Sequence, residues 1–342
     1  MPIDTVFDKK NVLVTGGAGF IGSHLCETLL RDARVICLDN FTTSDVENIN
    51  HLLKNGDFEF IRHDINTPFD PENYPELARF KIKFQGIQEI YHLACPTSPK
   101  KFDQYRLQTL YANSLGMKHA LDVAVKYKSR TVFTSTAVAY GPRPADGHLF
   151  QEDEFGTSDT LSPRACYDEG KRFAESCCQT YANVHGIDVR IARVFRTYGP
   201  RMPLYDGQMI PDFITSALDA KDLEIYGDET FRTSLVFVGD VVDGLMKLMA
   251  SADETLKVVN LGSDMDVLLV DVARRIAEMT GSRSKVAFKP PLLFMSQLGL
   301  PDLTRAKERL GWIPLMTLDE GLKQTIEYAM AHKSLLSFRS IG

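Results

Sequence analysis

Short apolar runs alternate with helix-like segments through the first 195 residues of the chain. Runs of this length that are apolar along their whole extent are typical of parallel strands buried between two layers of helices. The predicted strands are 12–14, 35–38, 58–61, 89–93, 131–134 and 189–194. The predicted helices lie near residues 21–30, 107–127 and 165–184. This alternation predicts an α/β fold with a parallel sheet that carries helices on both faces.

The pattern changes after about residue 200, where prolines and glycines become frequent and only one clear helix, over 238–249, stands out. We therefore predict a doubly wound sheet domain over residues 1–200, to which residues 235–265 return. Residues 201–342 mainly form a smaller C-terminal domain that binds substrate. A ligand is expected between the two regions.

Composition excludes several other classes of protein. With 342 residues, 44% of them apolar, the chain can bury a large core, and its net charge of −6 argues against a nucleic-acid partner. The sequence has no apolar stretch of membrane-spanning length and no apolar signal core at its N-terminus, which predicts a cytoplasmic protein. The six cysteines form no CxxC pair, so we expect reduced thiols and no metal site.

A glycine motif follows the first predicted strand and opens the first predicted helix. Gly16, Gly19 and Gly22 have the spacing that permits a tight turn, close approach of a pyrophosphate and tight packing of helix on strand. Asp39 ends the second strand, where a carboxylate accepts hydrogen bonds from an adenosine ribose and repels a 2′-phosphate. These residues predict a Rossmann-type domain that binds NAD rather than NADP. Asp64, after the third strand, fits an adenine contact or an ordinary helix cap.

A tyrosine and a lysine lie four residues apart in the third predicted helix. Tyr167 and Lys171 therefore point to the same side of that helix. A neighbouring ammonium favours the phenolate, so we expect Lys171 to lower the pKa of Tyr167 and to make it a base near neutral pH. The hydroxyl cluster 134–136 at the end of the fifth strand is placed to orient a substrate alcohol.

Together these motifs resemble the extended short-chain dehydrogenase/reductases, the NAD-dependent epimerase/dehydratase family, over nearly the whole chain. Within that family, further segments resemble UDP-glucuronate decarboxylases. The matching segments are His92-Leu93-Ala94, Pro96-Thr97-Ser98-Pro99, residues 163–172 around Tyr167, Tyr198-Gly199-Pro200-Arg201-Met202, and the tail 301–312.

The resemblance implies a mechanism and a set of contacts. NAD takes hydride from C4 of the sugar, Tyr167 takes the hydroxyl proton, the 4-keto acid loses carbon dioxide, and the hydride returns. Thr136, Tyr167 and Lys171 match the family's catalytic residues, and a homodimer paired through helices 107–127 and 165–184 is expected. The predicted cofactor contacts are Gly16, Gly19, Phe20, Ile21, Gly22, Asp39, Asn40, Thr42, Asp64, Ile65, Leu93, Ala94, Tyr167 and Lys171.

The chain departs from the decarboxylase pattern beside the catalytic hydroxyl. The family has Ser-Glu after it, whereas this chain has Ala137 and Val138, and a valine moves no proton. Loss of the acid disfavours a 4,6-dehydratase still more strongly. A hydroxyl followed by small apolar residues is similar to the UDP-hexose 4-epimerases.

Three more departures fall on the substrate side. Arg196 stands where the family has asparagine, Gln208 where arginine is usual, and Arg232 one residue before the family's arginine, a place that Thr233 takes. Either Arg196 supplies the charge that Gln208 lost, or the substrate has changed. The predicted substrate contacts are Pro96, Ala137, Arg196, Arg201, Gln208 and Arg232.

The leading functional hypothesis is an NAD-dependent UDP-glucuronate decarboxylase, because a β-keto acid loses carbon dioxide readily even without the missing acid. The alternative is a UDP-sugar 4-epimerase, with UDP-glucuronate among its candidate substrates. A catalytically inactive NAD-binding sensor is the third hypothesis, and the intact Thr136, Tyr167 and Lys171 argue against it.

Overall fold

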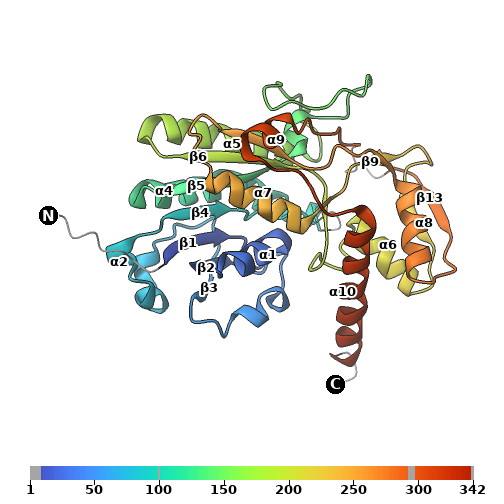
Figure 1. Cartoon of the computed structure of the whole chain (residues 1–342), viewed down its shortest axis with the longest axis horizontal. Coiled ribbons are helices and arrows are strands. Elements are labelled where there is room, and N and C mark those ends of the chain that lie inside the picture. Colours follow the sequence, from blue (N-terminus) through green and yellow to red (C-terminus); the bar gives the residue numbers. More distant parts are fainter. Residues whose placement is uncertain (1–8, 99–100, 292–296, 340–342) are drawn as a thin grey trace.

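The computed structural model describes residues 9–98, 101–291 and 297–339; residues 1–8 and Pro99 of the motif above lie outside these ranges. A seven-stranded parallel sheet, of order β11-β6-β5-β4-β1-β2-β3, forms its centre (Figure 1). The predicted doubly wound sheet is thus confirmed. Its strands are β1 Lys10–Thr15, β2 Ala33–Asp39, β3 Phe58–Arg62, β4 Glu89–His92, β5 Arg130–Thr136, β6 Val189–Val194 and β11 Val258–Leu261.

The order of the strands reverses at β1, which pairs with β2 on one side and with β4 on the other. Chain connections leave such a point in opposite directions, so a crevice opens beyond the carboxyl ends of the two central strands. Thr15, the last residue of β1, is paired with Leu38 of β2 and His92 of β4 at this edge. The fold thereby fixes where a ligand can enter.

Two apolar layers hold the helices against the sheet. Successive residues of β1 alternate between them: Val12 and Val14 pack in one cluster and Leu13 in the other. The first cluster includes side chains of α1 and α7, and the second includes side chains of α4 and α5. The helices with these bounds are α1 Phe20–Leu29, α2 Ile82–Gln85, α3 Arg106–Tyr111, α4 Met117–Tyr127, α5 Ala165–His185 and α7 Val238–Ala250.

The remaining elements gather beside the sheet domain, on the right of Figure 1, around a third apolar cluster. Three two-stranded ladders join them: β7 with β10, β9 with β12, and β8 with β13. The bounds are α6 Met209–Leu218, α8 Leu269–Met279, α10 Leu318–Arg339, β7 Thr197–Tyr198, β8 Leu223–Tyr226, β9 Arg232–Thr233, β10 Val236–Phe237, β12 Val267–Leu268 and β13 Val286–Lys289.

The chain returns to the sheet domain twice. α7 and β11 do so, with β11 pairing in parallel with β6. α9 (Thr304–Leu310) also packs against β11 and α7, a return that the sequence analysis does not include. Trp312 follows it, is fully buried, and donates its indole N–H to the Asp240 carbonyl oxygen at 2.9 Å.

The predicted helix over 107–127 is interrupted in the structure. A π-helical turn, η6 (Ala112–Gly116), separates α3 from α4. Asn113 is buried in this turn and donates its side-chain N–H to the Thr109 carbonyl oxygen at 2.9 Å and to the Cys95 sulfur at 3.2 Å. Periodicity alone does not show a one-residue insertion, but an irregularity at Asn113 is among the features that the family resemblance implies.

Candidate active site

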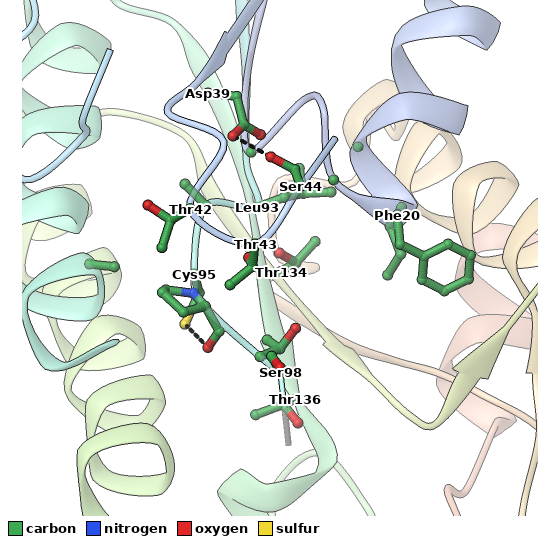
Figure 2. Close-up of a pocket in the computed structure, with 18 of the residues that line it drawn as sticks. Phe20, Asp39, Thr42, Thr43, Ser44, Leu93, Cys95, Ser98, Thr134 and Thr136 are labelled. Atoms are coloured by element: carbon green, nitrogen blue, oxygen red, sulfur yellow. Dashed lines mark hydrogen bonds between the residues drawn. The ribbon is translucent and has the colours of Figure 1, made fainter. Parts of the chain in front are cut away.

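A cavity of about 350 Å³ opens at the carboxyl edge of the sheet, where the strand order reverses. Figure 2 shows Asp39 and Thr136 at opposite ends of this pocket, with Leu93, Thr43 and Cys95 between them. Its wall includes every predicted cofactor contact and all three predicted catalytic residues, Thr136, Tyr167 and Lys171.

The glycine motif forms a cradle built from backbone. Gly16 has φ of +71°, and a Cβ placed on it would come within 2.8 Å of the Ala94 nitrogen. A Cβ on Gly22 would overlap the Gly16 carbonyl oxygen. α1 begins directly after Gly19, and no side chain caps it. Its first amides and positive dipole end are therefore available to a pyrophosphate.

Asp39 lies at the end of β2, and its carboxylate is already oriented by its neighbours. One oxygen accepts a hydrogen bond from the Ala18 amide at 3.0 Å, and the other accepts from the Phe41 amide at 2.9 Å and from the Ser44 hydroxyl at 2.7 Å. Ser44 also lines the cavity and was not predicted. This fixed carboxylate suits a pair of ribose hydroxyls.

Asp64 lines the same end of the cavity and also accepts a hydrogen bond from the Asn66 amide at 2.9 Å. No helix begins at this residue, so the side chain supports a local turn instead of a helix cap while it faces the cavity.

The three predicted catalytic side chains come from two elements. Thr136 ends β5, while Tyr167 and Lys171 lie on α5. Lys171 is buried, donates to the Thr134 carbonyl oxygen at 2.9 Å, and has its nitrogen 6.0 Å from the centre of the Tyr167 ring. A phenol, an ammonium and a hydroxyl thus meet at one place on the cavity wall.

The electrostatics of this cluster differ from the prediction. Burial raises the pKa of Tyr167, and the hydrogen bond with Thr136 opposes the shift without reversing it. Burial also lowers the pKa of Lys171. The predicted lowering of the Tyr167 pKa is therefore outweighed by burial, because removal from water disfavours the charged form of both groups.

The π-helical turn η6 packs against α5, the helix that carries Tyr167 and Lys171. Gly170 lies between Tyr167 and Lys171 in sequence, and a Cβ there would come 3.1 Å from the Asn113 side chain. A larger residue at this position would require the Asn113 side chain to shift, so glycine favours close packing of α5 on η6. The packing sets the depth at which both catalytic side chains enter the cavity.

The substrate side holds only part of its predicted set. Pro96, Arg196 and Gln208 line the cavity. Ala137, Arg201 and Arg232 are not part of its wall. Ala137 is buried in an apolar cluster behind the wall, Arg201 forms an ion pair with Glu27 of α1, and Arg232 pairs with Asp266 at 2.6 Å.

Sequence and structure comparisons assign this arrangement to a family. The profile of the NAD dependent epimerase/dehydratase family matches residues 12–262. The chain belongs to this family. UDP-glucuronic acid decarboxylase 1 of Xenopus tropicalis is 37% identical over 322 residues, which cover 94% of this chain and 72% of that protein.

Two solved epimerases in the epimerase/dehydratase family have a similar fold. UDP-glucuronic acid 4-epimerase from Bacillus cereus, in complex with UDP-glucuronic acid and NAD, has a TM-score of 0.81 and 26% identity, covering 94% of this chain and 99% of that chain. UDP-glucose 4-epimerase from Thermotoga maritima, with UDP-glucose, has a TM-score of 0.81 and 29% identity, covering 95% and 99%.

The residues present fit the cofactor of the epimerase/dehydratase family. The cradle has no room for a Cβ at Gly22, the helix behind it has no side-chain cap, and Asp39 is held at the far end. These are the features that a dinucleotide requires of its pyrophosphate and ribose sites. NAD is confirmed as the cofactor at the level of the family.

Some residues of the cavity wall were missed. Ser98 and Asp206 are joined by a hydrogen bond, and Met202, Pro203 and Leu298 complete this part of the wall. Ser98 and Met202 lie in segments that carry the family resemblance but were not among the predicted contacts, and no motif or periodicity marked Asp206, Pro203 and Leu298.

Neither a membrane-spanning helix nor a metal-binding cluster occurs among the described residues. Within 9–98, 101–291 and 297–339, no helix combines the length and apolar character that crossing a bilayer requires. In the same part of the chain, no three His, Cys, Asp or Glu side chains are grouped to hold a metal ion.

Proposed function

We propose that this protein is an enzyme that oxidises C4 of the UDP-glucuronate ring transiently and releases carbon dioxide, as a UDP-glucuronate decarboxylase does. The observation that carries the proposal is the meeting of Thr136, Tyr167 and Lys171 in the cavity that holds the dinucleotide cradle. The decarboxylase relative, at 37% identity, supports the choice of substrate.

Each catalytic side chain has a task that follows from its position. The Thr136 hydroxyl would hold the ring alcohol, and Tyr167, as the phenolate, would take its proton and become the phenol. NAD bound in the cradle would supply the hydride acceptor. Lys171 stabilises the phenolate from α5 and is itself held by the Thr134 carbonyl. The resulting ketone is β to the carboxylate, so loss of carbon dioxide leaves a stabilised enolate.

A UDP-sugar 4-epimerase is the second candidate, and one observation favours it. Val138 is buried at the position where the decarboxylases carry glutamate. No acid is therefore supplied there to protonate C5 after decarboxylation. An epimerase needs no such acid, because its ketone rotates and is reduced from the other face.

The deciding experiment is to incubate the purified protein with UDP-glucuronate and NAD and to analyse the nucleotide sugars by mass spectrometry and NMR. The decarboxylase proposal predicts a UDP-pentose or UDP-4-keto-pentose and carbon dioxide. A C4 epimer of unchanged mass would instead establish the epimerase. The matched control is Tyr167→Phe, which keeps the ring and removes the phenol oxygen; no product of either kind is expected from it.

We also propose a homodimer paired through α3 and α5. These helices and the intervening turn leave large apolar side chains exposed: Leu107, Leu110, Tyr111, Leu115, Phe173 and Val184. Adjacent exposed apolar groups of this kind favour burial against a second copy. Light scattering should give twice the chain mass, and Leu107→Glu should weaken the dimer while the control Leu53→Glu does not. A monomeric native protein would contradict the proposal.

A further inference from the structure

Arg196 occupies an unusual place in the cavity wall. It follows β6 by two residues, and the last residue of that strand, Val194, is paired with Thr136 of β5. Strand spacing and rise therefore put the Arg196 backbone roughly 8 Å from the Thr136 backbone, within reach of a long side chain. Arg196 lines the cavity, as do Thr136 and Tyr167.

The Arg196 guanidinium has no carboxylate partner among the described residues. Its hydrogen bond there goes to the Met209 sulfur at 3.2 Å, and a thioether is a weak acceptor. Burial and the nearby Arg164 lower its pKa to about 10, so the group remains a cation at neutral pH. A desolvated cation without an anion is costly, and an anionic ligand would offset that cost.

Other basic groups near the cavity are already engaged. Arg201 pairs with Glu27, and Arg232 shares Asp266 with Arg143. Lys171 lines the cavity but is held by the Thr134 carbonyl oxygen. Within the described part of the wall, Arg196 is therefore the arginine left to bind an anion beside the reacting ring.

We infer that Arg196 is a specificity-determining residue, which binds the carboxylate of the sugar acid and selects a uronic acid over a neutral hexose. The inference rests on the proposed function, since it concerns the substrate of that site. The planar guanidinium can form two parallel hydrogen bonds with a carboxylate. Arg196 lies near the end of β5, where Thr136 would hold the C4 alcohol of the sugar. The carboxyl group of the sugar acid is attached at C5, the neighbouring carbon.

The test is a set of binding measurements on the NAD-loaded protein, by calorimetry, with UDP-glucuronate, UDP-glucose and UDP. All proteins carry Tyr167→Phe so that no ligand is consumed. Arg196→Asn should weaken the binding of UDP-glucuronate by about 10- to 100-fold and should change the affinities for UDP-glucose and UDP by less than about twofold. Arg196→Lys should fall between, since it keeps the charge and loses the paired geometry.

The matched control is Arg274→Asn, the same substitution at an exposed arginine of α8, which should leave all three affinities unchanged. Equal weakening of all three ligands would overturn the inference and assign Arg196 to the diphosphate. No change in any of them would overturn it as well. If the unmodified site binds none of the three ligands, the proposed function fails instead, and this result is distinct from both.

Discussion

The two ends of the cavity differ in how they are built. The cofactor end is made of backbone: a glycine turn, the start of α1, and one carboxylate fixed by two amides and a hydroxyl. The substrate end is made of side chains from loops that follow β4, β6 and β7. All the predicted cofactor contacts lie in the wall, but only half of the predicted substrate contacts do.

This difference teaches which kind of site a sequence reveals. A backbone site needs glycine where any side chain would collide, so its residues are fixed at one spacing. A side-chain site depends on where loops place charged groups, and a shift of one residue, as at Arg232, sends the group to another partner. The predictions below test each end and the boundary between them.

The largest effect, on turnover, is expected at the boundary between the two ends, where Tyr167 contacts both the cofactor site and the substrate site. Tyr167→Phe removes only the phenol oxygen and should lower turnover of UDP-glucuronate by about 10²- to 10⁴-fold, the contribution of one acid–base group. NAD affinity, measured by fluorescence titration, should change little because the cradle is untouched. Turnover within a few fold of the native protein would show that another group acts as the base.

The substrate end is tested by restoring the acid of the decarboxylases. Val138→Glu should raise formation of the UDP-pentose by up to about 100-fold if proton transfer to C5 limits the reaction. Val138→Gln is the matched control, with similar size and no acid, and should give no gain. Because Val138 is buried, circular dichroism must first show that both variants are folded. A folded Val138→Glu protein with no gain would favour the epimerase.

The cofactor end is tested by filling its cradle. Gly22→Ala puts a methyl group on the Gly16 carbonyl oxygen, so the turn must shift. Overpacking of this kind costs about 1–3 kcal/mol, which would correspond to roughly a 5- to 150-fold loss of NAD affinity. The control is Gly56→Ala, where nothing lies within 4 Å of the added methyl group. Equal NAD affinity in the two variants would contradict the claim that the glycine cradle binds NAD.

A smaller effect is expected at the ribose. Asp39→Asn keeps the shape and removes the charge, so NAD should bind about 10-fold more weakly while NADP is less strongly rejected. The ratio of the two dissociation constants is the quantity to measure. Asp32→Asn, at an exposed position that precedes β2, is the control and should leave the ratio unchanged.

The smallest effect concerns acid stability. Burial lowers the pKa of His24 to about 4 and that of His92 to about 3, from an ordinary value near 6.5. The unfolded chain therefore binds more protons below pH 6.5, and the stability that the neutral rings provide is lost as the pH falls towards 4.

His24 links α1 to the loop after β7, because its ring bonds to the Pro200 carbonyl oxygen at 2.9 Å. In His24→Gln, the loss of unfolding free energy between pH 7 and pH 5 should be smaller by about 1–2 kcal/mol, as followed by urea denaturation. An unchanged pH dependence would show that His24 does not take up a proton on unfolding.

Much of the fold was predictable, because buried parallel strands and the glycine motif leave strong local signals. The return of α9 to the sheet was not, since it depends on packing between distant segments. The family resemblance implies an irregularity at Asn113, but only the structure shows that it is a π-helical turn. In the site, the residues of the catalytic cluster were found from spacing. Their pKa values were not, because the direction of the Tyr167 shift depends on burial that a sequence does not show.

The central claim is that a ring alcohol is oxidised to a ketone beside Tyr167. Rapid mixing of the NAD-loaded protein with UDP-glucuronate, followed by the absorbance of reduced nicotinamide, tests it directly. The account predicts a transient rise of that absorbance, slowed when the substrate carries deuterium at C4 and absent in Tyr167→Phe. Product formation at the same rate with either substrate, with no reduced nicotinamide at any time, would contradict it.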